Sequence, residues 1–338
     1  MTGLPAPKLD ARKLSVTAFV VATASLALYL GAHRGSDGMS EKSAAQNVAP
    51  AFSGARALRY IRQICELGPR PSGSEGMHKQ QELLENHFRK LGAVVLRQRF
   101  MARQRSRPRP VEMVNLIARW YPERSQRVIL CAHYDTRPIA DQEPDRRDWH
   151  KPFLGANDGA SGPALLMELA HHLPDLRVRV GVDFVLFDGE EYIFDPRPQE
   201  AGGDVYFLGS EYFARDYSKS ADGLVYQAAI LLDMVAGRDA RFYYEQYSWT
   251  RHGRLVKEVW DIARELGVRR FVPRVGAAML DDHLALQRVG IPAIDIIDAD
   301  YPHWHRLSDT PEQCAPDTLT DVGIVVAEWL RRQERRHR

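Results

Sequence analysis

Four short apolar segments of the sequence each run into a histidine or acidic side chains. The stretches between them space their apolar residues as helices do. Alternating strands and helices predict one α/β domain with a largely buried sheet. In open α/β sheets, ligands bind beyond the carboxyl ends of the strands, so these polar residues should meet there. The segments are 127–133 with His133, 182–188 with Glu190 and Glu191, 226–234 with Asp233, and 291–297 with His305.

The same patterns predict where the helices and strands lie. Helices are expected over 55–68, 76–92, 162–173, 209–217, 254–267, 281–290 and 320–333. Besides the four segments above, strands are expected over 93–100 and 114–120, which alternate apolar and polar residues and should pair.

The overall charge gives no reason to propose nucleic acid as a partner. Lys and Arg together number 46, and Asp and Glu number 44, for a net charge of +2. The basic C-terminal end reads as a solvated tail on the last helix. The three cysteines, Cys65, Cys131 and Cys314, fit neither a zinc knuckle nor a disulfide framework. One disulfide could form, with its pairing open, so any metal must be held by histidine and carboxylate.

The N-terminal residues 1–32 have the features of a membrane anchor. An uncharged stretch, 14–32, follows Lys8, Arg12 and Lys13 and is long enough to span a bilayer. The basic residues before it predict a cytoplasmic N-terminus and a folded part outside the cytoplasm. A cleaved signal segment, giving a secreted protein, is the alternative. Residues 33–52 are small and polar and read as a linker, so the folded domain is expected over 53–338.

Five residues at the expected sheet edge are candidate ligands for a metal. Two imidazoles and several carboxylates in a dry crevice are typical of a zinc site. Each residue also has a simpler explanation: Asp158 in "GANDGASG" can cap a helix, His133 can be a hydrogen-bonded core histidine, and Asp233 can cap a loop. These separate explanations would require all five residues to gather at one edge of the sheet by accident, which makes a shared metal site the better explanation. The candidates are His133, Asp158, Glu191, Asp233 and His305, with Glu190 beside them.

The pair Glu190 and Glu191 follows the buried run in "FVLFDGEEY". Adjacent side chains at a strand end point in different directions, so the two can hold different roles. One glutamate would ligate a divalent ion, and the other would stay free to move protons. Burial raises the pKa of a free carboxyl toward neutrality, as a general acid and base requires.

The motifs of this sequence resemble those of the zinc aminopeptidase family, which also includes the glutaminyl cyclases. The similar stretches are "LGPRPSGSEG", "HYD", "NDGASG", "DGEE", "LLDM" and a late histidine. The resemblance covers about 53–335 and implies a single-domain α/β/α sandwich with a mixed, mostly parallel central sheet. In the aminopeptidases a bridging aspartate joins two zinc ions. The corresponding positions here are His133, Asp158, Glu191, Asp233 and His305, with Glu190 as base.

Later motifs look more like the cyclases, which retain similar residues yet bind one zinc ion. They are "DDHLALQRVGIP", "YPHWH" and "DGEEYIFDPRPQEAGGDVYFLGS". The cyclase resemblance implies that peptide or protein N-termini are the substrate and that N-terminal glutamine becomes pyroglutamate. The implied roles are zinc ligands Asp158, Glu191 and His305, proton carrier Glu190, a buried acid network of Asp233 and Asp281, and substrate contacts Trp304 and Tyr301.

Two departures keep a di-zinc aminopeptidase as the alternative. "NDGASG" is closer to the aminopeptidase version, and Pro196 lies near the place where cyclases carry a pocket tryptophan. Asp281 can also be a helix N-cap and Trp304 ordinary packing. A single zinc ion would follow if Asp281 hydrogen-bonds Asp233 and holds it off the metal, with His133 donating to Asp135 or a neighbour. A metal-free receptor or binding ectodomain is a third hypothesis, although such relatives would be expected to have lost ligands.

Overall fold

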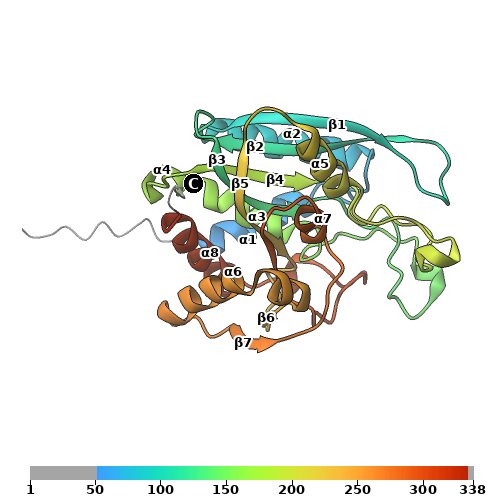
Figure 1. Cartoon of the computed structure of the whole chain (residues 1–338). Coiled ribbons are helices and arrows are strands. Elements are labelled where there is room, and N and C mark those ends of the chain that lie inside the picture. Colours follow the sequence, from blue (N-terminus) through green and yellow to red (C-terminus); the bar gives the residue numbers. More distant parts are fainter. Residues whose placement is uncertain (1–51, 334–338) are drawn as a thin grey trace, which may run out of the picture. The chain divides into compact units, whose positions relative to one another are not determined.

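A six-stranded mixed sheet forms the centre of residues 52–333, the part of the chain that this computed structural model describes (Figure 1). The strand order is β1-β2-β4-β3-β5-β8. The two pairs β1–β2 and β2–β4 are antiparallel, and the three pairs from β4 to β8 are parallel. The strands are β1 (Val94–Ala102), β2 (Val111–Trp120), β3 (Gln126–His133), β4 (Gly181–Phe187), β5 (Val225–Asp233) and β8 (Ala293–Ile297).

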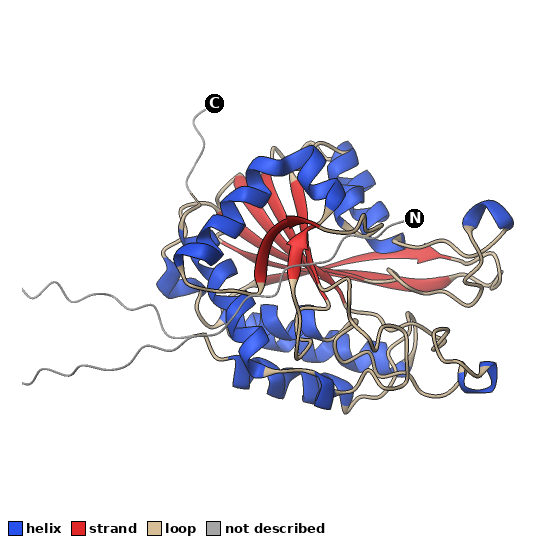
Figure 2. Cartoon of the chain, turned by 90° about the horizontal axis from the view of Figure 1, so that it is seen from below, coloured by secondary structure: helices blue, strands red, loops and turns tan. Residues whose placement is uncertain are grey.

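Helices cover both faces of this sheet, so the predicted α/β/α sandwich is confirmed (Figure 2). On one face lie α1 (Gly54–Cys65), α2 (Glu75–Lys90), α3 (Ser161–Ala170), α4 (Leu173–Leu176), α6 (Gln246–Glu265) and α8 (Pro316–Arg331). On the other lie α5 (Leu208–Lys219) and α7 (His283–Arg288).

Strand β3 shows why the central segments are apolar without a break. Val128, Leu130 and Ala132 are buried in the larger core, under α1, α3 and α8. Ile129 and Cys131 point to the opposite face and are buried with residues of α5 and α7. Since successive side chains of a strand alternate between faces, a strand covered on both must be apolar throughout.

The helix that was expected over 254–267 begins earlier in the structure. It starts at Gln246, where the Glu245 side chain accepts hydrogen bonds from the backbone N–H groups of Tyr247 and Ser248. The helix is kinked at His252, so its first turns do not continue the apolar stripe of the rest. The short strands β6 (Phe242–Tyr244) and β7 (Phe271–Val275), which form a second, parallel two-stranded sheet, were also not predicted.

Three short 3₁₀-helices lie in the connections: η1 (Arg146–Asp148), η2 (Gln199–Ala201) and η3 (Pro311–Gln313). The three cysteines are buried free thiols. The predicted membrane segment 1–32 and the linker up to residue 51 lie outside the described residues. Among the helices within 52–333, none is long and apolar enough to cross a membrane.

Candidate active site

The polar residues that follow the apolar segments meet at the carboxyl edge of the parallel strands, as predicted. Two groups of potential metal ligands share Asp158, and within each group the ligand atoms lie within 4.8 Å of one another. The groups are Asp158 with Glu191 and His305, and Asp158 with His133 and Asp233. His133 ends β3, Asp233 ends β5, Glu191 follows β4, Asp158 precedes α3, and His305 lies between β8 and α8.

The first group has the donor set of a zinc site. The Nε2 atom of His305 lies 3.1 Å from Oε2 of Glu191 and 3.6 Å from Oδ2 of Asp158. That oxygen of Asp158 is buried without a hydrogen-bond partner. A buried carboxylate oxygen without a partner is costly unless a cation binds it. An imidazole and two carboxylates therefore fit a zinc ion, with a further position left for substrate.

The second group is held together by His133. Its Nε2 atom lies 3.1 Å from Oδ1 of Asp233 and 3.2 Å from Oδ1 of Asp158. Its Nδ1 atom is 3.8 Å from the nearest Asp135 oxygen, too far for a hydrogen bond. Of the two partners expected for His133, Asp135 or a neighbour, the structure shows a neighbour, Asp233.

The structure also corrects the expected hydrogen bond between Asp281 and Asp233. Asp281 instead accepts the backbone N–H of Asp282 at 2.6 Å, and none of the described hydrogen bonds joins it to Asp233. The two carboxyls still interact through charge. Burial raises the pKa of Asp281 well above its usual value, and the negative charges of Asp233 and Asp282 raise it further. Within the predicted acid network, Asp281 and Asp233 are therefore linked by charge repulsion and not by a hydrogen bond.

Asp135 holds the backbone of the two glutamates, whose side chains lie in different places. Its two carboxylate oxygens accept the backbone N–H groups of Glu190 at 3.0 Å and Glu191 at 3.2 Å. The Glu191 side chain turns toward the metal ligands, where Oε1 accepts the backbone N–H of Arg137 at 2.7 Å. The Glu190 side chain lines the cavity beside them. Glu190 also forms a group of possible ligands with His133 and Glu191, so the division into one ligand and one free carboxyl stays a prediction.

Glu190 is placed where a carboxyl holds a proton easily. Burial raises its pKa well above the usual value; the charge of His133 lowers it, and those of Glu191 and Asp281 raise it. The side chain nevertheless keeps 14% of its surface exposed. A proton on Glu190 can therefore be exchanged with a molecule in the cavity.

Two carboxylates that the sequence did not single out support the metal ligands. Asp141 places Oδ1 3.2 Å from Nδ1 of His305, and it also pairs with Arg137. Asp309 accepts the backbone N–H of Asp158 at 3.0 Å. Such partners fix the orientation of ligands. Both lie in loops without periodicity, so no pattern in the sequence pointed to them.

Tyr301 has a different place from the one expected. Its hydroxyl donates to Oδ1 of Asp309 at 2.7 Å, its side chain is buried, and it does not line the cavity beside the metal ligands. It therefore acts on the site through Asp309, which holds the loop that carries Asp158. The other predicted substrate contact, Trp304, does line the cavity.

This cavity has a volume of about 280 Å³ and mainly apolar walls. Trp304 is 42% exposed, and its ring stacks on that of His305 with centroids 3.9 Å apart. Tyr206 and Phe207, which sequence reasoning missed, form another part of the wall. The one sequence feature that could have indicated them is that two adjacent aromatic residues precede a predicted helix, at some distance from the glutamate pair. Besides these, the cavity is lined by Asp158, Glu190, Glu191, Gln199, Asp233, Met234, Met279, Leu280, Asp281, Ile297 and His305.

Comparison with known proteins places this arrangement in a family. The model of peptidase family M28 matches residues 115–330. The chain belongs to peptidase family M28. Its M28 fold is similar to the crystal structure of Fimbriiglobus ruber glutaminyl cyclase, with 50% sequence identity and a TM-score of 0.82, over 84% of this chain and 96% of that chain. The predicted resemblance to the cyclase branch is thereby confirmed.

Other M28 relatives represent both branches. A leucine aminopeptidase precursor from Bacteroides thetaiotaomicron is 31% identical with a TM-score of 0.79, over 85% of this chain and 99% of that chain. The glutaminyl-peptide cyclotransferase of Bos taurus is 24% identical over 249 residues, which are 64% of this chain and 66% of the bovine protein. The match therefore spans just under two thirds of that relative.

The backbone of this M28 site is strained at three places. Phe207, Met234 and His305 have φ angles of 63°, 47° and 53°, a left-handed conformation that residues other than glycine rarely adopt. All three line the cavity. Strain of this kind persists where the surrounding structure enforces it, and it often marks functional sites.

Proposed function

We propose that this chain is a zinc-dependent glutaminyl-peptide cyclotransferase that converts the N-terminal glutamine of peptides to pyroglutamate and releases ammonia. The observation that carries the proposal is the position of Glu190. Its carboxyl faces the same cavity as the Asp158, Glu191 and His305 group, and its own group of possible ligands, with His133 and Glu191, includes neither Asp158 nor His305. The likeness to a glutaminyl cyclase at 50% identity supports the choice of this reaction.

The residues of the cavity divide the chemistry between them. Zinc held by Asp158, Glu191 and His305 would polarise the side-chain amide carbonyl of the substrate glutamine. Glu190 accepts a proton as the α-amine attacks the amide carbon and the new C–N bond forms. Glu190 then returns the proton to the departing amide nitrogen, which leaves as ammonia when its own C–N bond breaks. Trp304 and Phe207 provide apolar walls that hold the glutamine side chain and exclude water.

The direct test is incubation of the zinc-loaded protein with a short glutamine-initiated peptide. Cyclisation releases ammonia, and the mass of the peptide falls by the mass of one ammonia molecule. A matched peptide that begins with asparagine serves as the control, because its shorter side chain would have to close a strained four-membered ring. Release of free glutamine in place of ammonia would contradict the proposal.

A di-zinc aminopeptidase is the second candidate, and one observation favours it. His133 and Asp233 assemble a second potential site around Asp158. In that case Glu190 would act on a water molecule that attacks the first peptide bond. We propose one tightly held zinc ion, on the strength of the cyclase likeness, and elemental analysis of purified protein tests it. Two zinc ions per chain together with release of free amino acids would establish the aminopeptidase.

We also propose that residues 14–32 anchor the enzyme in a membrane, with the catalytic domain outside the cytoplasm. The support is the uncharged stretch behind three basic residues. Fractionation of cells that express the full chain tests this proposal. Resistance to alkaline extraction indicates a retained anchor, whereas recovery in the medium without these residues indicates cleavage.

A further inference from the structure

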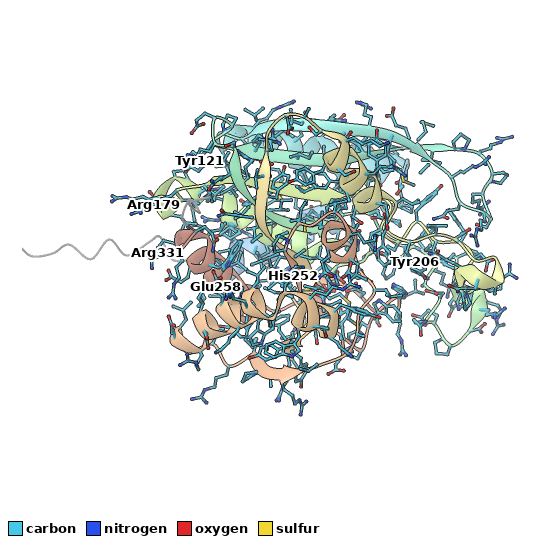
Figure 3. All side chains as sticks on the ribbon, in the orientation of Figure 1. Tyr121, Arg179, Tyr206, His252, Glu258 and Arg331 are labelled. Carbon is cyan, nitrogen blue, oxygen red and sulfur yellow. The ribbon has the colours of Figure 1, made fainter. Side chains whose placement is uncertain are left out.

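A second hollow borders the cavity of the proposed active site. Its volume is about 570 Å³, and it shares Gln199, Tyr206 and Phe207 with the first cavity. Tyr206, labelled in Figure 3, lies near the long loops that extend from one end of the sheet. The end of β1, the loop before α5 and the first turns of α5 form this hollow. Its remaining lining residues are Phe100, Met101, Ala102, Arg103, Val205, Leu208, Glu211, Tyr212 and Arg215.

Hydrogen bonds fix the two loops that border this hollow. The side chain of Gln104 donates to the carbonyl of Val205 at 2.6 Å and accepts the backbone N–H of the same residue at 2.8 Å. Ser106 donates from its backbone N–H and its hydroxyl to Asp204 at 2.9 and 2.6 Å. Gln104 is only 1% exposed. The hollow is therefore formed before a ligand arrives, which lowers the entropic cost of binding.

The hollow carries a positive charge. The loop after β1 reads "RQRSRPR" over 103–109, with four arginines and no acidic residue. Arg103 and Arg215 line the hollow, are exposed and form no ion pair with another residue of 52–333. The acidic residue of the lining, Glu211, is already paired with Arg288. Two uncompensated guanidinium groups beside apolar walls favour an acidic, partly apolar ligand.

We propose that this hollow binds the residues that follow the N-terminal glutamine of the peptide substrate, and that it favours peptides with acidic side chains in that segment. The inference rests on the proposed cyclotransferase function. The occupant is the substrate itself, because the three shared residues connect the hollow with the cavity that holds the reacting glutamine. The proposal names a class of substrate: peptides that carry aspartate or glutamate shortly after an N-terminal glutamine.

Three matched peptides test the preference: Gln-Ala-Glu-Glu-Ala, Gln-Ala-Gln-Gln-Ala and Gln-Ala-Lys-Lys-Ala, each amidated. We expect kcat/KM to fall in that order, by about 3- to 10-fold per step at low salt and mainly through KM. Added salt should compress the differences because the arginines are exposed. In the variant R103S/R215S the acidic and neutral peptides should be turned over equally well. The control R269S removes an exposed arginine from the turn after α6, far along the chain, and should keep the order.

The outcomes separate this inference from the function on which it rests. Equal kcat/KM values for the three peptides, or an acidic preference that persists in R103S/R215S, would overturn the inference while leaving the cyclotransferase intact. Absence of ammonia release from every peptide would contradict the proposed function. Fluorescence anisotropy with a labelled acidic peptide then still decides the inference, because weaker binding by R103S/R215S than by R269S supports the charged hollow and equal binding refutes it.

Discussion

The two ends of strand β4 carry buried carboxylates in opposite electrostatic situations. Near its amino end, Asp183 is fully buried and is surrounded by donors. The guanidinium of Arg127 lies 2.6 Å away, that of Arg119 at 3.1 Å, and the hydroxyl of Tyr226 donates at 2.6 Å. Beyond its carboxyl end, Glu190 and Glu191 share their surroundings with further carboxylates.

This difference separates a structural carboxylate from a functional one. At Asp183 the protein supplies the compensating charges itself, so nothing else need bind. At the carboxyl end the side chains of His133 and His305 face several carboxylates, and a buried oxygen of Asp158 has no hydrogen-bond partner. Buried negative charge that the chain leaves uncompensated predicts a bound cation. The comparison can be tested by removing carboxylates at each end.

The largest effect is expected from removal of a metal ligand. Asp158→Ala, Glu191→Ala and His305→Ala should each lose zinc and abolish activity, because each removes one of the three proposed protein ligands. The measurements are zinc content by elemental analysis and ammonia release. Full activity in any of the three would remove that residue from the ligand set and weaken the contrast with Asp183.

Glu190→Gln should lower kcat by about 10² to 10⁴ without loss of zinc, because it removes proton transfer alone. Zinc content and melting temperature should match those of the unaltered protein. If this variant lost zinc while Glu191→Gln retained it, the roles of the two glutamates would be reversed.

Asp183→Ala should destabilise the fold by about 3–5 kcal/mol, because it leaves the buried guanidinium of Arg127 without its partner. Chemical denaturation measures the free energy of unfolding. Zinc content of the folded fraction should be unchanged, in contrast to the ligand variants. A loss of unfolding free energy below about 1 kcal/mol would contradict the idea that Asp183 and its donors form a well-compensated charge cluster, in contrast to the carboxylates beyond the other end of β4.

The zinc-free protein should lose stability as pH rises. Burial and the charge of Asp158 raise the pKa of Glu191 to about 7. A carboxyl whose pKa is raised on folding binds its proton more tightly in the native state, so ionisation between its ordinary pKa and 7 favours unfolding. The melting temperature of the zinc-free form should fall by about 5–10 °C between roughly pH 5 and 8. The melting temperature of the zinc-loaded form should change less over this range. If the melting temperatures of both forms fell equally with pH, the loss could not be attributed to Glu191.

The smallest effect is expected at Tyr301→Phe, which removes the hydroxyl that donates to Asp309. Partners that orient a ligand indirectly typically contribute about 10-fold or more to metal affinity. Competition with a chelator should show weaker zinc binding, while the kcat of the zinc-saturated enzyme stays close to that of the parent. A change in KM for the peptide at saturating zinc would instead return Tyr301 to the substrate-binding role first predicted for it.

The ligand cluster was predictable because it follows a rule of sheet topology. His133 and Asp233 end apolar strands, and Glu190 and Glu191 directly follow one, so their meeting at one edge needs only the order of strands and helices. Asp141 and Asp309 could not be found in this way, because they reach the site through loops whose course depends on tertiary contacts. The hydrogen-bond partner of Asp281 could not be predicted either, because its carboxylate accepts the backbone N–H of the next residue, Asp282, and no sequence pattern indicates such a local contact.

The fold was predictable where packing imposes a period on the sequence. Every strand of the central sheet left such a pattern, and so did each helix that covers its faces except the four-residue α4. The first turns of α6 did not, because Glu245 starts that helix through a cap and His252 interrupts it. The aromatic wall at Tyr206 and Phe207 was missed for a related reason: its residues precede α5 and belong to no periodic segment.

The left-handed backbone at Met234 bears on how this protein can be engineered for heat resistance. A residue other than glycine in this conformation costs about 1–2 kcal/mol, so Met234→Gly would relieve a local cost. The same change removes a side chain that packs with Ile297 and lines the cavity. Because Met234 is buried, the packing lost with its side chain costs about 2–5 kcal/mol and outweighs this relief, so glycine at this position would give a less heat-resistant protein. A search for heat resistance should therefore leave this left-handed residue in place and seek its gains away from the cavity wall.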